Sequence, residues 1–212
     1  MSIAHRLEHA YTGAVYDALR ETGRSHCALP SRIRPLDPGR KLAGRVFTVT
    51  GRRDDSLDPH ETLLAWTAML SRIPPDSVVV CQPNDRDLAF LGELSAETLQ
   101  FRQVRGMVID GGCRDTDFIL RIGFRVFCSH MTPMDIVGKW IVTDLGKPVT
   151  IGEVRVETGD YLLGDRDGIV VVPGALAEDV TARVEDVLRT ENLVRKAILQ
   201  GVDPRKAYVE HG

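Results

Sequence analysis

The chain has 212 residues, of which 43% are hydrophobic and 27% are charged, an ordinary balance for a globular protein. A chain of this length buries roughly 70% of its unfolded surface, so it needs neither a disulfide nor a structural metal to stay folded. The formal net charge of −3 argues against a function dominated by nucleic-acid phosphates, which favour a basic surface.

The cysteines and the first residues bear on the compartment. No C-x-x-C pair occurs, so no zinc ribbon or redox motif is present, and scattered cysteines without a secretion signal fit a reducing compartment. The first 15 residues lack an apolar core of signal-peptide length, and no apolar run approaches the ~20 residues that span a bilayer. We therefore expect a soluble, cytoplasmic protein whose partners include neither a membrane nor nucleic acid. The four cysteines are Cys27, Cys81, Cys113 and Cys128.

Helical and strand patterns alternate along the first two thirds of the chain. Apolar residues at helical spacing predict helices, and short runs of β-branched residues predict strands. The expected elements are a helix over residues 7–22, a strand over 42–50, a helix over 59–72, a strand over 77–81, a helix over 87–104, a strand over 106–110 followed by a turn at Gly111-Gly112, a helix over 115–122 and a strand over 125–128. This alternation favours a parallel sheet.

The pattern changes in the last third of the chain. Residues 139–172 consist of short apolar runs separated by Gly and Asp, which predicts a β-rich layer. Residues 174–199 predict one long helix, and a tail follows from Gly201. Together these features predict an α/β fold with three layers, β/β/α, in a single domain over residues 1–212 whose C-terminal helix and tail begin at about residue 174.

The segment DGGCRD, residues 110–115, contains the candidate site. Ligands of open α/β sheets bind at the carboxyl ends of strands, glycines let the backbone approach a ligand, and helix N-termini favour anions. Arg114 is suited to bind a carboxylate with two parallel hydrogen bonds, and Asp115 to bind a hard divalent cation such as Mg²⁺. The structural alternative is that Asp115 caps the helix and Arg114 makes a surface ion pair.

Other polar residues have structural interpretations that compete with functional ones. His5 and His9 are four residues apart on a helix and could bind a metal, but without an H-E-x-x-H glutamate a surface position is favoured. Asp165 and Asp167 fit a turn between two strands better than a site. Cys113 beside Arg114 could be a reactive thiol, since positive charge lowers a thiol pKa, whereas a packing role is favoured.

Several separated motifs resemble one family. The motif Gly92-Glu93-Leu94, followed by IDGGCRD over residues 109–115, is similar to the paired motifs of the 4-hydroxy-4-methyl-2-oxoglutarate aldolase family. That RraA-like family also contains a regulator of ribonuclease E. The segments TGAVYDAL, AGRVFTV and GDYLLGDRDGIVVVP resemble its opening helix, first core strand and C-terminal β-layer, so the resemblance covers most of the chain.

The resemblance implies a swivelling β/β/α domain, assembled as a homotrimer or homohexamer with sites near subunit contacts. It implies that Arg114 contacts the carboxylate or keto oxygen of the substrate, and that Asp115 binds a divalent metal, Mg²⁺ or alternatively Mn²⁺. Glu93 would act as a general acid or base, directly or through a water, or would hold a metal-bound water that takes the proton, against the structural alternative of a first-turn carboxylate near the helix dipole. The residues whose backbone groups would bind the substrate carboxylate are Gly92, Glu93, Leu94 and Ser95.

On this resemblance we expect a class II, metal-dependent lyase. It would cleave a 4-hydroxy-2-oxo acid, such as 4-hydroxy-4-methyl-2-oxoglutarate, to pyruvate, and would decarboxylate oxaloacetate through the same enolate. Two alternatives are a non-catalytic regulator that binds a ribonuclease and an RraA-like enzyme with a different substrate. The Gly-Glu-Leu motif and the aspartate after the arginine, which the regulator branch lacks, favour the enzyme. Departures from the family pattern, at residues 82–85, Cys113 and residues 131–140, concern the distal half of the substrate pocket.

Overall fold

The largest element of the computed structural model, which describes residues 1–211, is a sheet of eight strands. Gly212, the end of the predicted tail, lies outside the described residues. The strands follow the order β1-β5-β4-β3-β2-β9-β10, and β6 also pairs with β2. The strands of this sheet are β1 (Arg34–Pro35), β2 (Leu42–Arg53), β3 (Ser77–Gln82), β4 (Gly106–Cys113), β5 (Arg125–Met131), β6 (Trp140–Leu145), β9 (Tyr161–Gly164) and β10 (Ile169–Val172).

The centre of the sheet is parallel, as the alternation of strand and helix patterns predicts. Strands β2, β3, β4 and β5 pair in parallel, whereas β1, β6, β9 and β10 pair antiparallel with their neighbours. A separate antiparallel hairpin consists of β7 (Val149–Ile151) and β8 (Val154–Val156). The helices are α1 (Ile3–Glu8), α2 (Thr12–Glu21), α3 (Pro59–Arg72), α4 (Glu93–Phe101), α5 (Thr116–Ile122), η1 (Gly174–Leu176), α6 (Ala177–Leu199) and α7 (Pro204–His211).

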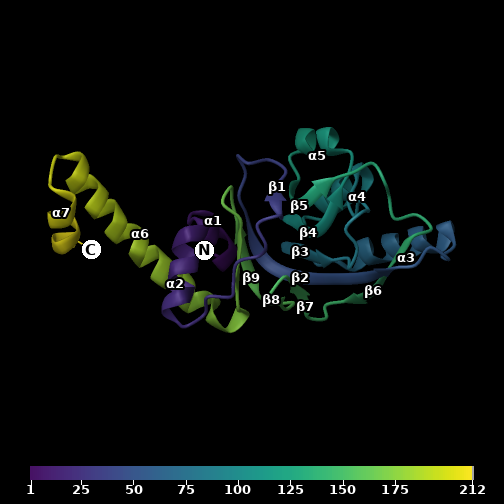
Figure 1. The fold of residues 1–212 in the computed structure, drawn as a ribbon, viewed down its shortest axis with the longest axis horizontal. Coiled ribbons are helices and arrows are strands. Elements are labelled where there is room, and N and C mark those ends of the chain that lie inside the picture. The colour runs from purple at the N-terminus through teal and green to yellow at the C-terminus, as the bar shows by residue number, and fades with distance from the viewer. Residues whose placement is uncertain (212) are drawn as a thin grey trace.

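Alternate residues of the central strands face two different apolar cores. Val79 and Cys81 pack with α3, α4 and α5, while Val78 and Val80 pack with the β7–β8 hairpin and β9. Figure 1 shows these three helices on one side of β2 and β3 and the hairpin on the other. This arrangement confirms the expected β/β/α layering, and it explains why β3 is apolar at nearly every position.

Several strands are longer than the sequence pattern predicts. Strand β2 runs on to Arg53 because its last residues pair with β6. Strand β4 runs on to Cys113, so the prediction of a turn at Gly111-Gly112 is wrong. The strand continues because β4 goes on pairing with β5, with Gly112 opposite His130 and Cys113 opposite Met131 after an irregularity in the register. Both positions are glycine because their surroundings leave no room for a side chain. A Cβ at Gly111 would lie 2.7 Å from the Phe90 ring, and one at Gly112 would lie 2.6 Å from the Leu88 carbonyl oxygen.

Two predicted helices are shorter or divided. The helix expected over residues 7–22 is α1 and α2, separated at Tyr11, whose backbone is extended (φ −132°, ψ 156°). The helix expected over 87–104 is reduced to α4, because Ala89 and Phe90 donate backbone hydrogen bonds to Met134 and Gly112 instead of continuing a helix. The predicted tail contains α7.

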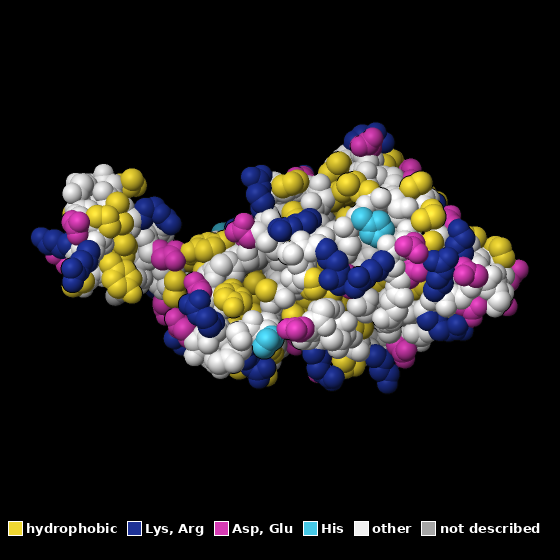
Figure 2. All heavy atoms as spheres, viewed as in Figure 1, with side chains coloured by type: hydrophobic (Ala, Val, Ile, Leu, Met, Phe, Trp, Pro, Cys, Tyr) yellow, Lys and Arg dark blue, Asp and Glu magenta, His cyan; other side chains and the backbone are white. Residues whose placement is uncertain are grey.

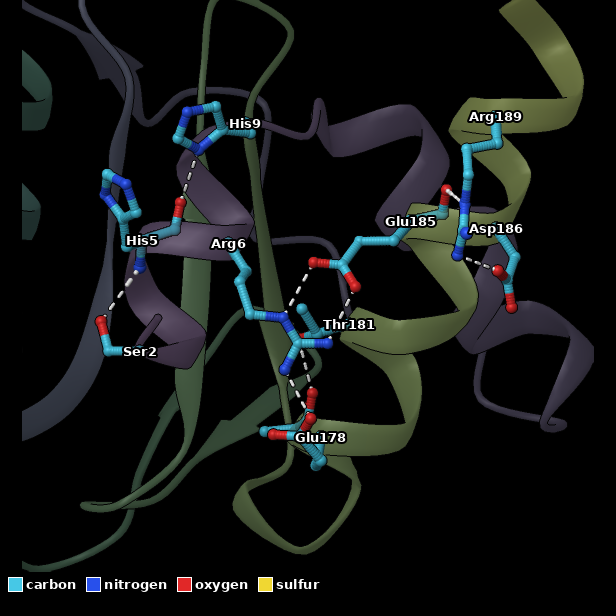
Figure 3. Close-up of polar contacts among 10 residues, drawn as sticks. Ser2, His5, Arg6, His9, Glu178, Thr181, Glu185, Asp186 and Arg189 are labelled. Carbon is cyan, nitrogen blue, oxygen red and sulfur yellow. Dashed lines mark hydrogen bonds and ion pairs between the residues drawn. The ribbon is translucent and has the colours of Figure 1, made fainter. Parts of the chain in front are cut away.

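The C-terminal helix α6 begins beside α1 and α2 and then extends away from the rest of the molecule (Figure 1). Its first half packs on α1 and α2 through Val180 and Val184. Arg6 of α1 makes ion pairs with Glu178 and Glu185 of α6 (Figure 3). The second half of α6 and α7 form an arm, and Figure 2 shows apolar side chains on its surface at the left. The exposed large apolar residues of this arm are Leu193, Ile198, Leu199, Tyr208 and Val209. Within residues 1–211, no helix has the length and apolar character needed to cross a bilayer.

Candidate functional site

The backbone at the end of β4 determines where Arg114 and Asp115 lie. Every residue of β4 is buried, so the end of the strand is held firmly. Asp115 then takes a left-handed conformation (φ 55°, ψ 36°), which Asp tolerates better than most residues with a side chain. Helix α5 begins at the next residue, one later than the sequence predicts.

The Asp115 side chain does not cap its own helix. Its Oδ2 atom accepts a hydrogen bond, 3.0 Å long, from the backbone N–H of Glu93 at the start of α4. The capping interpretation of Asp115 is therefore wrong. The carboxylate links the two sequence motifs, and the backbone does so too, because the Arg114 N–H donates to the Leu91 carbonyl at 2.9 Å.

Gly92 lies directly beneath this pair of side chains. Its backbone is extended (φ −135°, ψ −174°), a conformation open to any residue. A Cβ there, however, would lie 2.6 Å from Asp115 Oδ2 and 3.1 Å from Arg114 Nε. Because Gly92 has no side chain, Arg114 and Asp115 can lie in contact with the N-terminus of α4.

The start of α4 presents backbone donors to the same place. The first N–H groups of a helix have no acceptor within the helix. The N–H group of Glu93 donates to Asp115. The N–H groups of Leu94 and Ser95, also in the first turn of α4, have no acceptor among the described residues. Ser95 is held in place because its Oγ accepts a hydrogen bond from Trp66 Nε1 at 2.9 Å.

These residues line a cavity of about 660 Å³. Helices α3 and α4 and residues 135–137 form its walls, and Arg114 and Asp115 lie at its edge together with Gly92, Glu93, Leu94 and Ser95. The structure therefore brings together every residue of the predicted site. A second, smaller hollow of about 340 Å³ shares Arg114 and Asp115 and is bounded by Met131, Thr132 and Pro133.

Sequence reasoning missed Asp135. The Arg114 guanidinium lies between two carboxylates, with Nη1 3.1 Å from Asp135 Oδ2 and Nε 3.5 Å from Asp115 Oδ2. The signal was present in the sequence, since Asp135 falls in the 131–140 segment, which departs from the pattern expected of the family. An anionic substrate that binds Arg114 has to compete with these two carboxylates.

The donor set fits a hard divalent cation. Asp115 Oδ1 takes part in no hydrogen bond or ion pair with the described residues, and the carboxylate is 41% exposed. Glu93 and Asp135, which line the same cavity, also carry carboxylate oxygens. No cluster of three or more His, Cys, Asp or Glu side chains that could hold a metal occurs within residues 1–211. One carboxylate with water in the remaining positions suits Mg²⁺, which loses its waters reluctantly.

Asp110, the first residue of the DGGCRD motif, faces the opposite side of the sheet. Arg32 donates two hydrogen bonds to it, at 2.8 and 2.7 Å, and Gln82 and Ser129 also contact it. Burial raises the pKa of Asp110, but Arg32, with Gln82 and Ser129, outweighs burial and holds that pKa below its usual value. Asp110 is thus a buried structural carboxylate, and sequence reasoning did not identify Arg32 as its partner.

The competing structural interpretations hold for several other residues. Cys113 is fully buried, and the neighbouring Cys128 thiol and burial both raise the pKa of Cys113, which disfavours a reactive thiolate. The Asp165 carboxylate accepts hydrogen bonds from the N–H and Oγ1 of Thr12, both at 2.8 Å. It also accepts one from the N–H of Asp167, so it builds the predicted turn and anchors the start of α2.

The two histidines of α1 also match their structural interpretation. His5 and His9 both lie at least partly open to solvent, and the His9 ring Nδ1 is 2.8 Å from the His5 carbonyl oxygen. Neither belongs to a cluster of metal-ligating side chains among the described residues.

The fold agrees with comparisons to known proteins. The model of the family described as RraA-like, Aldolase/RraA, matches residues 12–171. The chain therefore belongs to the aldolase/RraA family. A relative from Ectopseudomonas mendocina, named "Putative 4-hydroxy-4-methyl-2-oxoglutarate aldolase", is 37% identical over 159 residues, covering 71% of this chain and 92% of the relative.

Two further proteins extend the likeness. A relative of the same name from Halalkalibacterium halodurans is 26% identical over 182 residues, which cover 86% of this chain and 83% of the relative. The crystal structure of Streptomyces coelicolor RraAS2, described as an unusual member of the RNase ES inhibitor RraA protein family, has a TM-score of 0.82. It covers 92% of this chain and 96% of that one at 24% identity, and so supports the shared fold.

Proposed function

We propose that the protein is a divalent-metal-dependent pyruvate aldolase acting on a 4-hydroxy-2-oxo acid. The observation that supports the proposal is the contact among Gly92, Glu93, Arg114 and Asp115, which puts a guanidinium, a carboxylate with one free oxygen and free helix N–H groups at one cavity. A 2-oxo acid needs this combination, because its carboxylate and keto oxygen both carry negative charge in the transition state.

The substrate is held at its 2-oxo acid end. Arg114 turns from Asp135 toward the substrate carboxylate and binds it with two parallel hydrogen bonds. The N–H groups of Leu94 and Ser95, at the positive end of α4, donate to the same group. This leaves the carbon–carbon bond to be broken, between carbons 3 and 4, directed into the cavity.

Asp115 would hold Mg²⁺ or Mn²⁺ through its free Oδ1 atom, while Oδ2 stays on the Glu93 N–H. When bound, the cation supplies a Lewis acid that stabilises the enolate of pyruvate. Glu93 takes the proton of the 4-hydroxyl group as the bond between carbons 3 and 4 breaks, which releases a carbonyl product. Glu93 then returns that proton to carbon 3 of the enolate, which gives pyruvate and regenerates the carboxylate. Oxaloacetate would lose CO₂ through the same enolate without a proton being removed from a hydroxyl.

Subunit assembly completes the proposal. Leu63, Leu64 and Leu94 are exposed on α3 and α4 beside the cavity, as expected where another subunit packs. We propose a homotrimer or a homohexamer with sites near the subunit contacts. Sedimentation of the protein should give a mass of three chains or a multiple of three, and a fully active monomer would contradict the assembly.

The proposal is tested by pyruvate release from 4-hydroxy-4-methyl-2-oxoglutarate and from oxaloacetate, with and without metal. EDTA should abolish release, and Mg²⁺ or Mn²⁺ should restore it. Asp115→Asn should lose activity at all metal concentrations. The control is Asp117→Asn, which changes an exposed aspartate on α5 and should behave as wild type.

Two outcomes would contradict the proposal. A Schiff base trapped by borohydride with substrate would show a lysine-dependent mechanism. Absence of pyruvate from every 4-hydroxy-2-oxo acid and from oxaloacetate, with metal present, would favour the alternative of a non-catalytic regulator that binds a ribonuclease.

A further inference from the structure

The segment that joins β5 to β6 holds the Asp135 carboxylate in a fixed orientation. The Ile136 side chain is buried in the core between the sheet and the helices, and the Ile136 carbonyl accepts a hydrogen bond from the Trp140 N–H at 3.1 Å. The Asp135 Oδ1 atom accepts a hydrogen bond, 3.2 Å long, from the N–H of Val137. The other oxygen, Oδ2, is therefore the one that meets Arg114.

The Arg114 guanidinium is shared unequally between two carboxylates. Its Nη1 atom donates to Asp135 Oδ2 at 3.1 Å, within the usual range for a hydrogen bond. Its Nε atom lies 3.5 Å from Asp115 Oδ2, outside that range. Asp115 Oδ2 already accepts from the Glu93 N–H, and Asp115 Oδ1 is left open. Asp135 is thus the stronger partner of Arg114.

Removal of the Asp135 carboxylate would change what Arg114 does to Asp115. Asp115 would then be the sole ion-pair partner of Arg114 within residues 1–211. A guanidinium binds a carboxylate best through two parallel hydrogen bonds, one to each oxygen. Such a pair would occupy Asp115 Oδ1, so a positive charge of the protein would compete with a metal for the one open oxygen.

The same contact counts once a divalent cation is bound at Asp115. The cation and Arg114 are then two positive charges that share one carboxylate and repel each other. Asp135 supplies a negative charge at Nη1, while Asp115 lies at Nε, so the charges alternate in sign from the cation to Asp135. These contacts come from the end of β4 and from residues 135–137, and not from the exposed apolar surface of α3 and α4 where another subunit is proposed to pack.

We propose that Asp135 is a positioning residue for the divalent cation: it holds the Arg114 guanidinium off Asp115 and so keeps Asp115 Oδ1 available as a metal ligand. This inference rests on the proposed metal-dependent function. It gives the 131–140 segment, which departs from the family pattern, a role at the metal end of the site. A substrate carboxylate that binds Arg114 replaces Asp135 as its partner and keeps Arg114 off Asp115 in the same way.

Binding of Mn²⁺ tests the inference without turnover. Free Mn²⁺ is measured by EPR as it is titrated into EDTA-treated, dialysed wild type and Asp135→Asn, whose amide oxygen can still accept from Val137. The Kd for Mn²⁺ should rise about fivefold, near the upper end of what one partly exposed ion pair contributes, because Arg114 then competes for Asp115. The control is Asp117→Asn, which removes an exposed negative charge near Asp115 that takes no part in the ion pairs of Arg114. Equal effects of the two variants would overturn the inference.

The same comparison in an Arg114→Met background tests whether Asp135 acts through Arg114. This change removes the guanidinium, so Asp135→Asn should then alter the Kd for Mn²⁺ by less than about twofold, as expected when the shared partner is absent. The same loss of affinity in both backgrounds would show that Asp135 acts on the cation directly and would overturn the positioning role.

Pyruvate release separates this inference from the proposed function. The Mn²⁺ concentration that gives half-maximal release should rise in Asp135→Asn by the same factor as the Kd. An active wild type, with Asp135→Asn binding Mn²⁺ equally well, would overturn the inference and leave the aldolase proposal standing. Weaker Mn²⁺ binding by Asp135→Asn, with no pyruvate released by wild type from any substrate, would overturn the aldolase proposal and leave the positioning role standing. A wild type that binds no Mn²⁺ would overturn both.

Discussion

Replacing Gly92 with alanine isolates the contact on which the site depends. The backbone at Gly92 is extended, so alanine causes no strain there, and the whole effect comes from the added methyl group. That methyl group would lie 2.6 Å from Asp115 Oδ2, whereas ordinary contact begins near 3.4 Å. The carboxylate must therefore move by about 0.8 Å, and Arg114, at 3.1 Å, must move with it.

The expected effect on stability is small and the effect on activity is large. Displaced Asp115 loses the 3.0 Å hydrogen bond from Glu93, worth ~1 kcal/mol for a partly exposed carboxylate. The side chains can rotate into solvent, so the fold should tolerate the change. A shift of about 1 Å in a positioned group can cost roughly 10²-fold in rate, so kcat/KM for pyruvate release should fall by ~10- to 100-fold.

The assay is steady-state pyruvate release combined with urea unfolding. Gly13→Ala, in the exposed face of α2 and far from the cavity, is the control for a glycine-to-alanine change. It should leave kcat/KM unchanged and raise stability slightly, because alanine favours a helix over glycine by about 1 kcal/mol. Wild-type kinetics for Gly92→Ala would refute the argument that Asp115 must stay on the N-terminus of α4.

Arg114→Lys keeps the charge but loses the planar fork, so kcat/KM should fall tenfold or more, about 1.4 kcal/mol of transition-state stabilisation; unchanged kinetics would place the site elsewhere. Glu93→Gln should slow cleavage of the 4-hydroxy acid by ~10²-fold and oxaloacetate decarboxylation much less, because only the former removes a hydroxyl proton; equal losses would assign Glu93 to positioning. Arg32→Met should lower the unfolding free energy at pH 7 by ~1–3 kcal/mol, since it leaves the Asp110 carboxylate buried without its cation. The pKa of Asp110 is held low, so its stabilising contribution is present at neutral pH and is lost as pH falls through that pKa. Urea unfolding should therefore show the two proteins converging in acid, and a constant difference would contradict the assignment.

The sequence predicts the parallel centre of the fold well, because β2 to β5 and the helices between them carry strong apolar patterns. It fails where tertiary contacts decide the backbone. Gly111 and Gly112 suggest a turn, yet β4 continues through them because it goes on pairing with β5, and they are glycine because Phe90 and the Leu88 carbonyl occupy the space of a side chain. Tyr11 fits the helical pattern of residues 7–22, but Asp165, far along the chain, binds the N–H of Thr12 and starts a new helix there.

The candidate site was predictable in its residues and not in its contacts. The motifs identify Gly92, Glu93, Arg114 and Asp115, and the structure places them together. The hydrogen bond from Glu93 to Asp115 and the Asp135 carboxylate at Arg114 depend on how three loops meet, which no local pattern encodes. The roles of these residues, the bound metal, the cytoplasmic location and the single domain remain predictions for experiment.

The position of α7 depends on the number of residues in the long helix α6 that precedes it. Its 23 residues span about 35 Å at 1.5 Å per residue, and the family match ends at residue 171, before the helix begins. Each residue inserted after Leu188 would move α7 outward by ~1.5 Å, and each residue deleted there would move it inward by the same distance; either change would rotate α7 by ~100° about the helix axis. A single insertion there would turn Leu199 and Tyr208 toward a different side of the molecule while leaving the cavity untouched. A change in the length of α6 could therefore alter what this C-terminal arm meets without altering the cavity beside Arg114.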